Sequence, residues 1–164
     1  MVSELLINNE QALRRLARGI HDCLRPGDCL LLSGPVGAGK TALARAIIQT
    51  QLARDGLVED VPSPTFTLVQ SYETGIGTIW HADLYRLAFI DEIHELGLFD
   101  NPNEDITLIE WPDRLGPLAP ARHLAIDITP AADEDARYMR LTPHGPGFDW
   151  IETLAARHKG SPTA

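Results

Sequence analysis

The sequence predicts an α/β domain in which helices flank a mixed central β-sheet. Short apolar runs alternate along the chain with segments of helical pattern, and a glycine-rich loop joins one such run to one such segment. Two further extended segments are separated by a turn so short that they must pair antiparallel. With 164 residues, we expect one domain over 1–158, followed by a disordered tail at 159–164.

The first part of the chain predicts an apolar segment, two helices and a buried strand. After the apolar residues 5–7, Asn8 or Asn9 can cap a helix that runs to about Leu24. The apolar run 29–33 follows turn-forming residues and predicts a buried strand. Helix formers fill 41–54 and are followed by a glycine, which is typical of a helix end.

The middle of the chain predicts a loop, a hairpin, a helix and another buried strand. Prolines at 62 and 64 favour an extended loop. Alternating β-formers at 65–72 and 78–83, with glycines between them, predict an antiparallel pair. Residues 85–98 have a helical pattern, and the continuous apolar run 106–110 predicts a strand buried on both faces.

The last part predicts a turn or short helix at 112–118, strands at 124–128 and 138–141, and a short helix at 148–156. No linker long enough to separate two domains occurs. The elements together predict a layered domain with its ligand site at the carboxyl ends of the central strands.

The glycine-rich loop has the pattern of a phosphate-binding loop. Residues 34–41 read Gly-Pro-Val-Gly-Ala-Gly-Lys-Thr and fit G-x-x-x-x-G-K-[ST]. Lys40 is the only lysine before residue 159. Its flexible ammonium can reach phosphates, the glycines let backbone N–H groups approach them, and Thr41 can offer a hydroxyl to Mg²⁺. We therefore expect the following residues to bind a nucleoside triphosphate: Gly34, Pro35, Val36, Gly37, Ala38, Gly39, Lys40, Thr41 and Ala42.

Two acids are candidates for catalytic and metal-binding groups. Asp83 ends the segment 78–83 and Glu110 ends the segment 106–110, so both carboxylates are expected at the edge of the sheet. We expect them to act in catalysis with Lys40, and to share Mg²⁺ with Thr41. The alternative for either acid is a strand-end carboxylate that faces solvent.

Each of five other positions has both a functional and a purely structural interpretation. Ser63 and Thr65 carry hydroxyls on a proline-stiffened loop, which could meet the nucleotide as a switch or form a rigid turn. Trp111 could stack on a base or belong to the core, and His81 could orient water or serve structure. Arg86 could stabilise charge in the site or lie exposed without such a role.

Charge and hydropathy limit the partners. The net charge of −9 disfavours direct binding to a nucleic-acid backbone. Residues 91–113 contain no lysine or arginine and many acids, so this segment is either a solvated surface or a docking surface for a basic partner. No apolar run approaches the roughly 18 residues that span a bilayer, and no signal-peptide pattern is present. With Cys23 and Cys29 interpreted as reduced thiols, we expect a cytoplasmic protein with no membrane partner.

Five segments together resemble the TsaE family of P-loop ATPases in bacterial tRNA threonylcarbamoyladenosine biosynthesis. They are 34–41, 63–69 (Ser-Pro-Thr-Phe-Thr-Leu-Val) with Tyr72, 81–87 (His-Ala-Asp-Leu-Tyr-Arg-Leu), 95–98 (Glu-Leu-Gly-Leu) and 108–112 (Leu-Ile-Glu-Trp-Pro). The resemblance covers roughly 5–145, and the chain departs from the family pattern in an acid-rich loop at 101–105 and beyond Arg157.

The resemblance implies a P-loop NTPase-like fold, ATP and Mg²⁺ as ligands, and a role for each site residue. Lys40 and Thr41 would bind phosphates and magnesium, Asp83 would serve the hydrolytic site, and Glu110 would join the magnesium shell. Ser63 and Thr65 would belong to a nucleotide-sensing switch.

The resemblance also implies a heterodimer of TsaD and TsaB as the partner. In the family, TsaD transfers the threonylcarbamoyl group from an adenylate to the adenosine beside the anticodon. ATP hydrolysis would serve repeated turnover and not the transfer itself. Contact with tRNA would then be indirect, through the partners.

Three other functions were weighed. A GTPase needs an Asn-Lys-x-Asp type motif, which lysines at 40 and 159 alone cannot form, so ATP is favoured over GTP. A small-molecule or nucleoside kinase usually has an arginine-rich lid over the phosphates. The nearest equivalent in this sequence is the scattered pair Arg86 and Arg114, which disfavours a kinase. A non-hydrolysing, nucleotide-controlled binding module shares the same loop and stays open.

Overall fold

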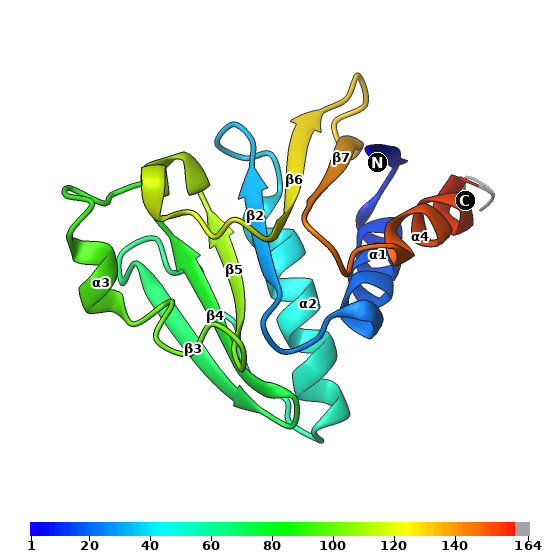
Figure 1. Cartoon of the computed structure of the whole chain (residues 1–164). Coiled ribbons are helices and arrows are strands. Elements are labelled where there is room, and N and C mark those ends of the chain that lie inside the picture. The colour runs from blue at the N-terminus through cyan, green and yellow to red at the C-terminus, as the bar shows by residue number, and fades with distance from the viewer. Residues whose placement is uncertain (160–164) are drawn as a thin grey trace.

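Seven strands form one mixed sheet in the order β1-β7-β6-β2-β5-β4-β3 (Figure 1). The computed structural model describes residues 1–159. The strands are β1 (Ser3–Ile7), β2 (Cys29–Ser33), β3 (Val69–Thr74), β4 (Gly77–Asp83), β5 (Ile106–Glu110), β6 (His123–Pro130) and β7 (Arg137–His144). The four central strands β6, β2, β5 and β4 are parallel, whereas β7, β1 and β3 join the sheet antiparallel. The predicted α/β class with a mixed sheet is confirmed.

Helices cover both faces of the sheet, but unequally. The helices α1 (Glu10–Cys23), α2 (Lys40–Arg54) and α4 (Trp150–Lys159) pack on one face, where the larger apolar core lies. The short helix α3 (Glu92–Leu96) and the 3-10 helix η1 (Pro112–Leu118) cover a smaller core on the other face. Leu30 and Leu31 of β2 contribute to opposite cores, which explains why β2 is apolar at successive positions.

The predicted start of the first helix and the predicted hairpin are confirmed. The Asn9 side chain accepts a hydrogen bond from the Ala12 backbone N–H at 2.9 Å and caps α1. Strands β3 and β4 pair antiparallel, with Thr74 opposite Gly77 at the turn. Sequence signals that act over a few residues therefore predicted these elements correctly.

The predicted helix over 85–98 is wrong, because only Glu92–Leu96 is α-helical. The Asp83 carboxylate accepts a hydrogen bond from the Tyr85 backbone N–H at 3.0 Å, and the Leu84 N–H donates to the Glu110 carbonyl at 3.1 Å. These bonds tie the start of the segment to the sheet edge and compete with the bonds of a helix. Single turns follow until α3 begins.

The predicted strand at 65–72 lies too early in the chain, since β3 spans Val69–Thr74. Leu68 has a positive φ of 67°, and its N–H donates to the Pro64 carbonyl at 2.7 Å. The backbone over 64–68 therefore turns before it enters the sheet, and this turn carries Thr65 toward β4.

The other observed boundaries of helices and strands differ from the predicted ones by a few residues. Strands β6 and β7 are longer than predicted, and α4 extends to Lys159, the first residue of the predicted tail. The rest of that predicted tail lies outside the described residues. Over residues 1–159, the structure has no helix with the length and apolar character to cross a membrane.

Candidate active site

The loop of residues 34–39 connects β2 to α2, as a phosphate-binding loop requires. It lies at the carboxyl end of β2, at the upper edge of the sheet in Figure 1. At Gly34, φ is +154°, and a Cβ atom there would lie 2.4 Å from the Ile128 carbonyl oxygen. Only glycine allows the loop to pass this close to β6.

The Lys40 side chain folds back over the loop and lies at the centre of the site. Its Nζ donates hydrogen bonds to the carbonyl oxygens of Gly34 and Pro35, the latter at 3.0 Å. The same ammonium lies 4.2 Å from the centre of the Trp111 ring. Burial lowers the pKa of Lys40, and the charges of Glu110 and Asp83 oppose this shift. The ammonium is thus held close to the backbone of the phosphate-binding loop.

Glu110 connects the loop helix α2 to the neighbouring strand β4. Its Oε1 accepts a hydrogen bond from the Thr41 hydroxyl at 2.7 Å, and its Oε2 lies 2.7 Å from His81 Nε2. Strand pleating places Glu110 on the same face as Leu108, which faces α2. His81 and Glu110 are 0% and 2% exposed, so His81 holds a buried carboxylate and does not face solvent.

Asp83 lies beside Glu110, because the two are paired in the parallel register of β4 and β5. Its Oδ2 accepts a hydrogen bond from the Thr65 hydroxyl at 3.2 Å, and its Oδ1 accepts one from the Tyr85 N–H. Ser63 Oγ lies 2.7 Å from Thr65 Oγ1. The loop over 62–65 therefore contacts Asp83 through the Thr65 hydroxyl, and the Ser63 hydroxyl contacts Thr65.

These side chains surround one pocket with a volume of about 370 Å³. Its lining residues are Val36, Gly37, Ala38, Gly39, Lys40, Thr41, Ala42, Thr65, Asp83, Tyr85, Glu110 and Trp111. Of the predicted residues, Gly34, Pro35 and Ser63 do not line it, although each contacts a residue that does. Arg86 lies apart, with its guanidinium 4.5 Å above the exposed Phe66 ring.

A larger hollow of about 570 Å³ between α1 and α2 does not have the features of the predicted site. Arginines 14, 18 and 54 are among its lining residues, but no residue of the phosphate-binding loop and no acid lines it. The 370 Å³ pocket is therefore the candidate active site.

Two residues that contact the loop or the pocket were not predicted from the sequence. Arg137 at the start of β7 donates from Nε to the Ala38 carbonyl at 2.8 Å, so it attaches the phosphate-binding loop to a distant strand. Tyr85 lines the pocket with its ring 4.8 Å from that of Trp111. No local motif marks Arg137, but the position of Tyr85 two residues after Asp83 was a usable signal.

The donor groups in the pocket suit Mg²⁺ that arrives with a nucleotide. The Thr41 hydroxyl and the carboxylates of Glu110 and Asp83 are hard oxygen donors. Over residues 1–159, no group of three or more His, Cys, Asp or Glu side chains could hold a metal ion alone. This agrees with the usual binding of Mg²⁺, which takes one or two carboxylates and completes its shell with phosphates and water.

Comparisons with known proteins agree on one family. Residues 7–139 match the family model described as threonylcarbamoyl adenosine biosynthesis protein TsaE. The chain is 35% identical to the tRNA threonylcarbamoyladenosine biosynthesis protein TsaE of Rickettsia felis, over 93% of this chain and 86% of the relative. It is 30% identical to the protein of that name from Bacillus subtilis, over 92% of this chain and 91% of the relative.

A solved structure supports the fold. The crystal structure of Bacillus subtilis YdiB superposes with a TM-score of 0.75, covering 98% of this chain and 97% of that one. The two sequences are 24% identical in this alignment, so the likeness concerns the fold alone.

Proposed function

This chain belongs to the TsaE family, and we propose that it is an ATPase that binds and hydrolyses Mg-ATP to drive turnover of the TsaD–TsaB complex, which forms threonylcarbamoyladenosine in tRNA. One observation carries the proposal. Lys40 and Thr41 at the start of α2 and Asp83 and Glu110 at the ends of two strands surround one pocket at the carboxyl edge of the parallel strands.

Each residue has a separate part in the proposed reaction. The Lys40 ammonium and the loop N–H groups bind the phosphates and stabilise the charge that develops on them. Bound Mg²⁺ would neutralise charge on the phosphates, and Thr41, Glu110 and Asp83 would hold it with its waters. Thr65 and the Tyr85 N–H fix the orientation of the Asp83 carboxylate. That carboxylate can then orient the attacking water.

The Ser63–Thr65 loop is proposed as the nucleotide-sensing part. The Thr65 hydroxyl donates to Asp83 and contacts the Ser63 hydroxyl, so a change at Asp83 on nucleotide binding would alter the bonds of the loop. We also propose that Trp111 contacts the nucleotide, since its ring lines the pocket beside Lys40. We also propose that the protein acts in the cytoplasm and that it contacts tRNA only indirectly, through the partner complex.

Phosphate release from ATP tests the proposal, first with the chain alone and then with purified TsaD–TsaB added. We expect slow release by the chain and faster release with the heterodimer. A requirement for a small phosphoryl acceptor would favour the kinase alternative. Nucleotide binding without any release, with and without the heterodimer, would favour the non-hydrolysing module.

A further inference from the structure

The surface around α3 carries acids that have no basic partner. Within residues 1–159, Asp91, Glu92 and Glu95 form no ion pair, and no lysine or arginine occurs between 91 and 113. The arginine ion pairs lie on other elements: Arg14–Glu10, Arg54–Asp22, Arg122–Asp28 and Arg140–Glu4. The nearby Arg114 of η1 donates to the Leu87 carbonyl and forms no ion pair with these acids, so their charges are unpaired within the described part of the chain.

An apolar pocket lies on the same surface. It has a volume of about 430 Å³, and its walls include Ile93, Phe99, Pro102, Leu118 and Pro120, from α3, η1 and the loops between them. Asp100 contributes to its lining. The pocket is thus mostly apolar, and Asp100 and His94 are the polar residues of its lining.

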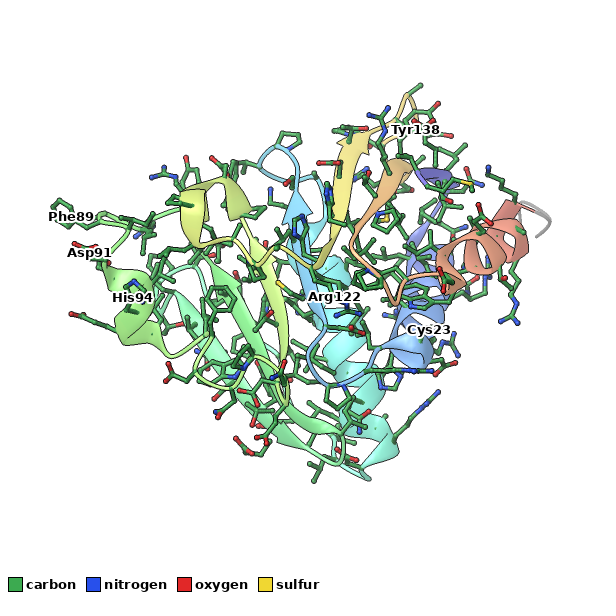
Figure 2. The ribbon with its side chains drawn as sticks, in the orientation of Figure 1. Cys23, Phe89, Asp91, His94, Arg122 and Tyr138 are labelled. Carbon is green, nitrogen blue, oxygen red and sulfur yellow. The ribbon has the colours of Figure 1, made fainter. Side chains whose placement is uncertain are left out.

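Exposed apolar side chains precede α3 in the chain. Phe89 is 72% exposed and Ile90 is 38% exposed. Figure 2 shows Phe89 and Asp91 projecting from the segment before α3, away from the sheet. We call this surface, formed by residues 89–102 and the end of η1, the α3 surface. Exposed apolar side chains and an apolar pocket on one surface are typical of a protein interaction site.

We propose that the α3 surface docks a basic segment of a protein partner, which places an apolar side chain in the pocket and lysines or arginines against Asp91, Glu92 and Glu95. The negative charge of the α3 surface favours a basic protein segment over other partners. Nucleic acid and anionic membranes would be repelled by the acids, and a second copy of a chain with net charge −9 would be repelled as well. The identity of the partner as TsaD–TsaB rests on the proposed function.

Binding of a partner to the α3 surface can affect the active site, because a short segment of the chain connects the two. The segment that carries Phe89 begins at Asp83, whose carboxylate accepts from the Tyr85 N–H at 3.0 Å. Tyr85 lines the nucleotide pocket. Phe89 and the acids of the α3 surface do not line that pocket, so their replacement leaves its walls intact.

The test measures affinity for purified TsaD–TsaB, with a fluorescent ATP analogue as a second ligand. Asp91→Lys/Glu95→Lys and, separately, Phe89→Ser should each weaken heterodimer binding about tenfold. Higher salt should reduce the effect of the charge reversal and not that of Phe89→Ser. The neutral pair Asp91→Asn/Glu95→Gln should weaken binding less than the reversal, since it removes attraction without adding repulsion.

Matched control variants distinguish a specific loss of docking at the α3 surface from a general effect of changed charge or lost apolar surface. Glu59→Lys/Glu152→Lys changes the net charge by the same amount, on exposed acids elsewhere, and Val58→Ser removes an exposed apolar side chain from a different part of the surface. Both controls should bind the heterodimer as the wild type does. All variants should bind the ATP analogue normally, which also shows that they are folded.

The outcomes are distinguishable. If the wild type binds TsaD–TsaB and the α3 variants bind equally well, the α3 proposal is overturned and the proposed function stands. If the wild type does not bind the heterodimer, both are overturned. A concentration-dependent dimer of the wild-type chain that Phe89→Ser abolishes would assign the surface to a second copy, and this would also overturn the proposal.

Discussion

The substitution Glu110→Gln tests the candidate active site most directly. It preserves the shape of a side chain that is 2% exposed and removes only its charge. Glu110 contacts both the loop helix, through Thr41, and the neighbouring strand, through His81. Its charge also opposes the lowering of the Lys40 pKa by burial.

The contacts of Glu110 predict a small effect on folding. A glutamine oxygen can still accept from His81 Nε2, and its NH₂ group can donate to the Thr41 hydroxyl, which then acts as the acceptor. Both contacts survive but change from charge-assisted to neutral, and the cost of burying a carboxylate disappears. We expect a loss of about 1 kcal/mol in unfolding free energy, which lowers Tm by about 2–4 °C.

The predicted effect on hydrolysis is much larger. Glutamine cannot supply negative charge to Mg²⁺ or to the network around Thr41. Loss of one preorganised electrostatic group in an active site typically costs about 10²–10³-fold in rate, or about 3–4 kcal/mol. The rate of hydrolysis should therefore fall far more than the small loss of stability could explain.

The assay is steady-state phosphate release at saturating ATP over a range of Mg²⁺ concentrations, with thermal unfolding measured alongside. Asp113→Asn is the control, since it removes the same charge from an exposed acid three residues further along. We expect wild-type rates from the control and a loss of at least about 100-fold from Glu110→Gln. Wild-type release by Glu110→Gln at every Mg²⁺ concentration would refute the assignment.

Three further predictions each concern a single residue. Arg137→Met leaves the carbonyl of the fully buried Ala38 without its side-chain donor, so affinity for a fluorescent ATP analogue should fall about 5–10-fold. Arg137→Lys should recover part of this affinity. Unchanged affinity in Arg137→Met would show that the contact does not position the loop. Gly34→Ala places a Cβ atom 2.4 Å from the Ile128 carbonyl oxygen, so Tm should fall by several degrees and nucleotide binding should be lost; a wild-type melting curve would contradict this. Burial raises the pKa of the Cys29 thiol from 9.0 to about 11, so folding favours the protonated form: this contribution is complete below pH 9 and disappears as pH rises to 11. Urea unfolding should show this loss, and Cys29→Ala should reduce it; equal pH dependence in both proteins would contradict the prediction.

Some parts of the fold and site could be predicted because their causes are local. The loop pattern at 34–41, the Asn9 cap and the hairpin turn before Gly77 depend on residues within a few positions of one another. Asp83 and Glu110 could be proposed as site residues because each ends an apolar strand. The α3 region could not be predicted correctly, since its helical pattern competes with hydrogen bonds to Asp83 and to the Glu110 carbonyl.

The sequence by itself determined the α/β class, the glycine-rich loop between β2 and α2, and the position of the two acids at strand ends. Only the tertiary structure decided that β4 lies directly beside β5, which pairs Asp83 with Glu110 and brings His81 to the Glu110 carboxylate. Only it brought Arg137, 99 residues away in the chain, to Ala38. The physical reason is that strand order and register are set by burial over both faces of the sheet, where residues distant in sequence compete for the same neighbours.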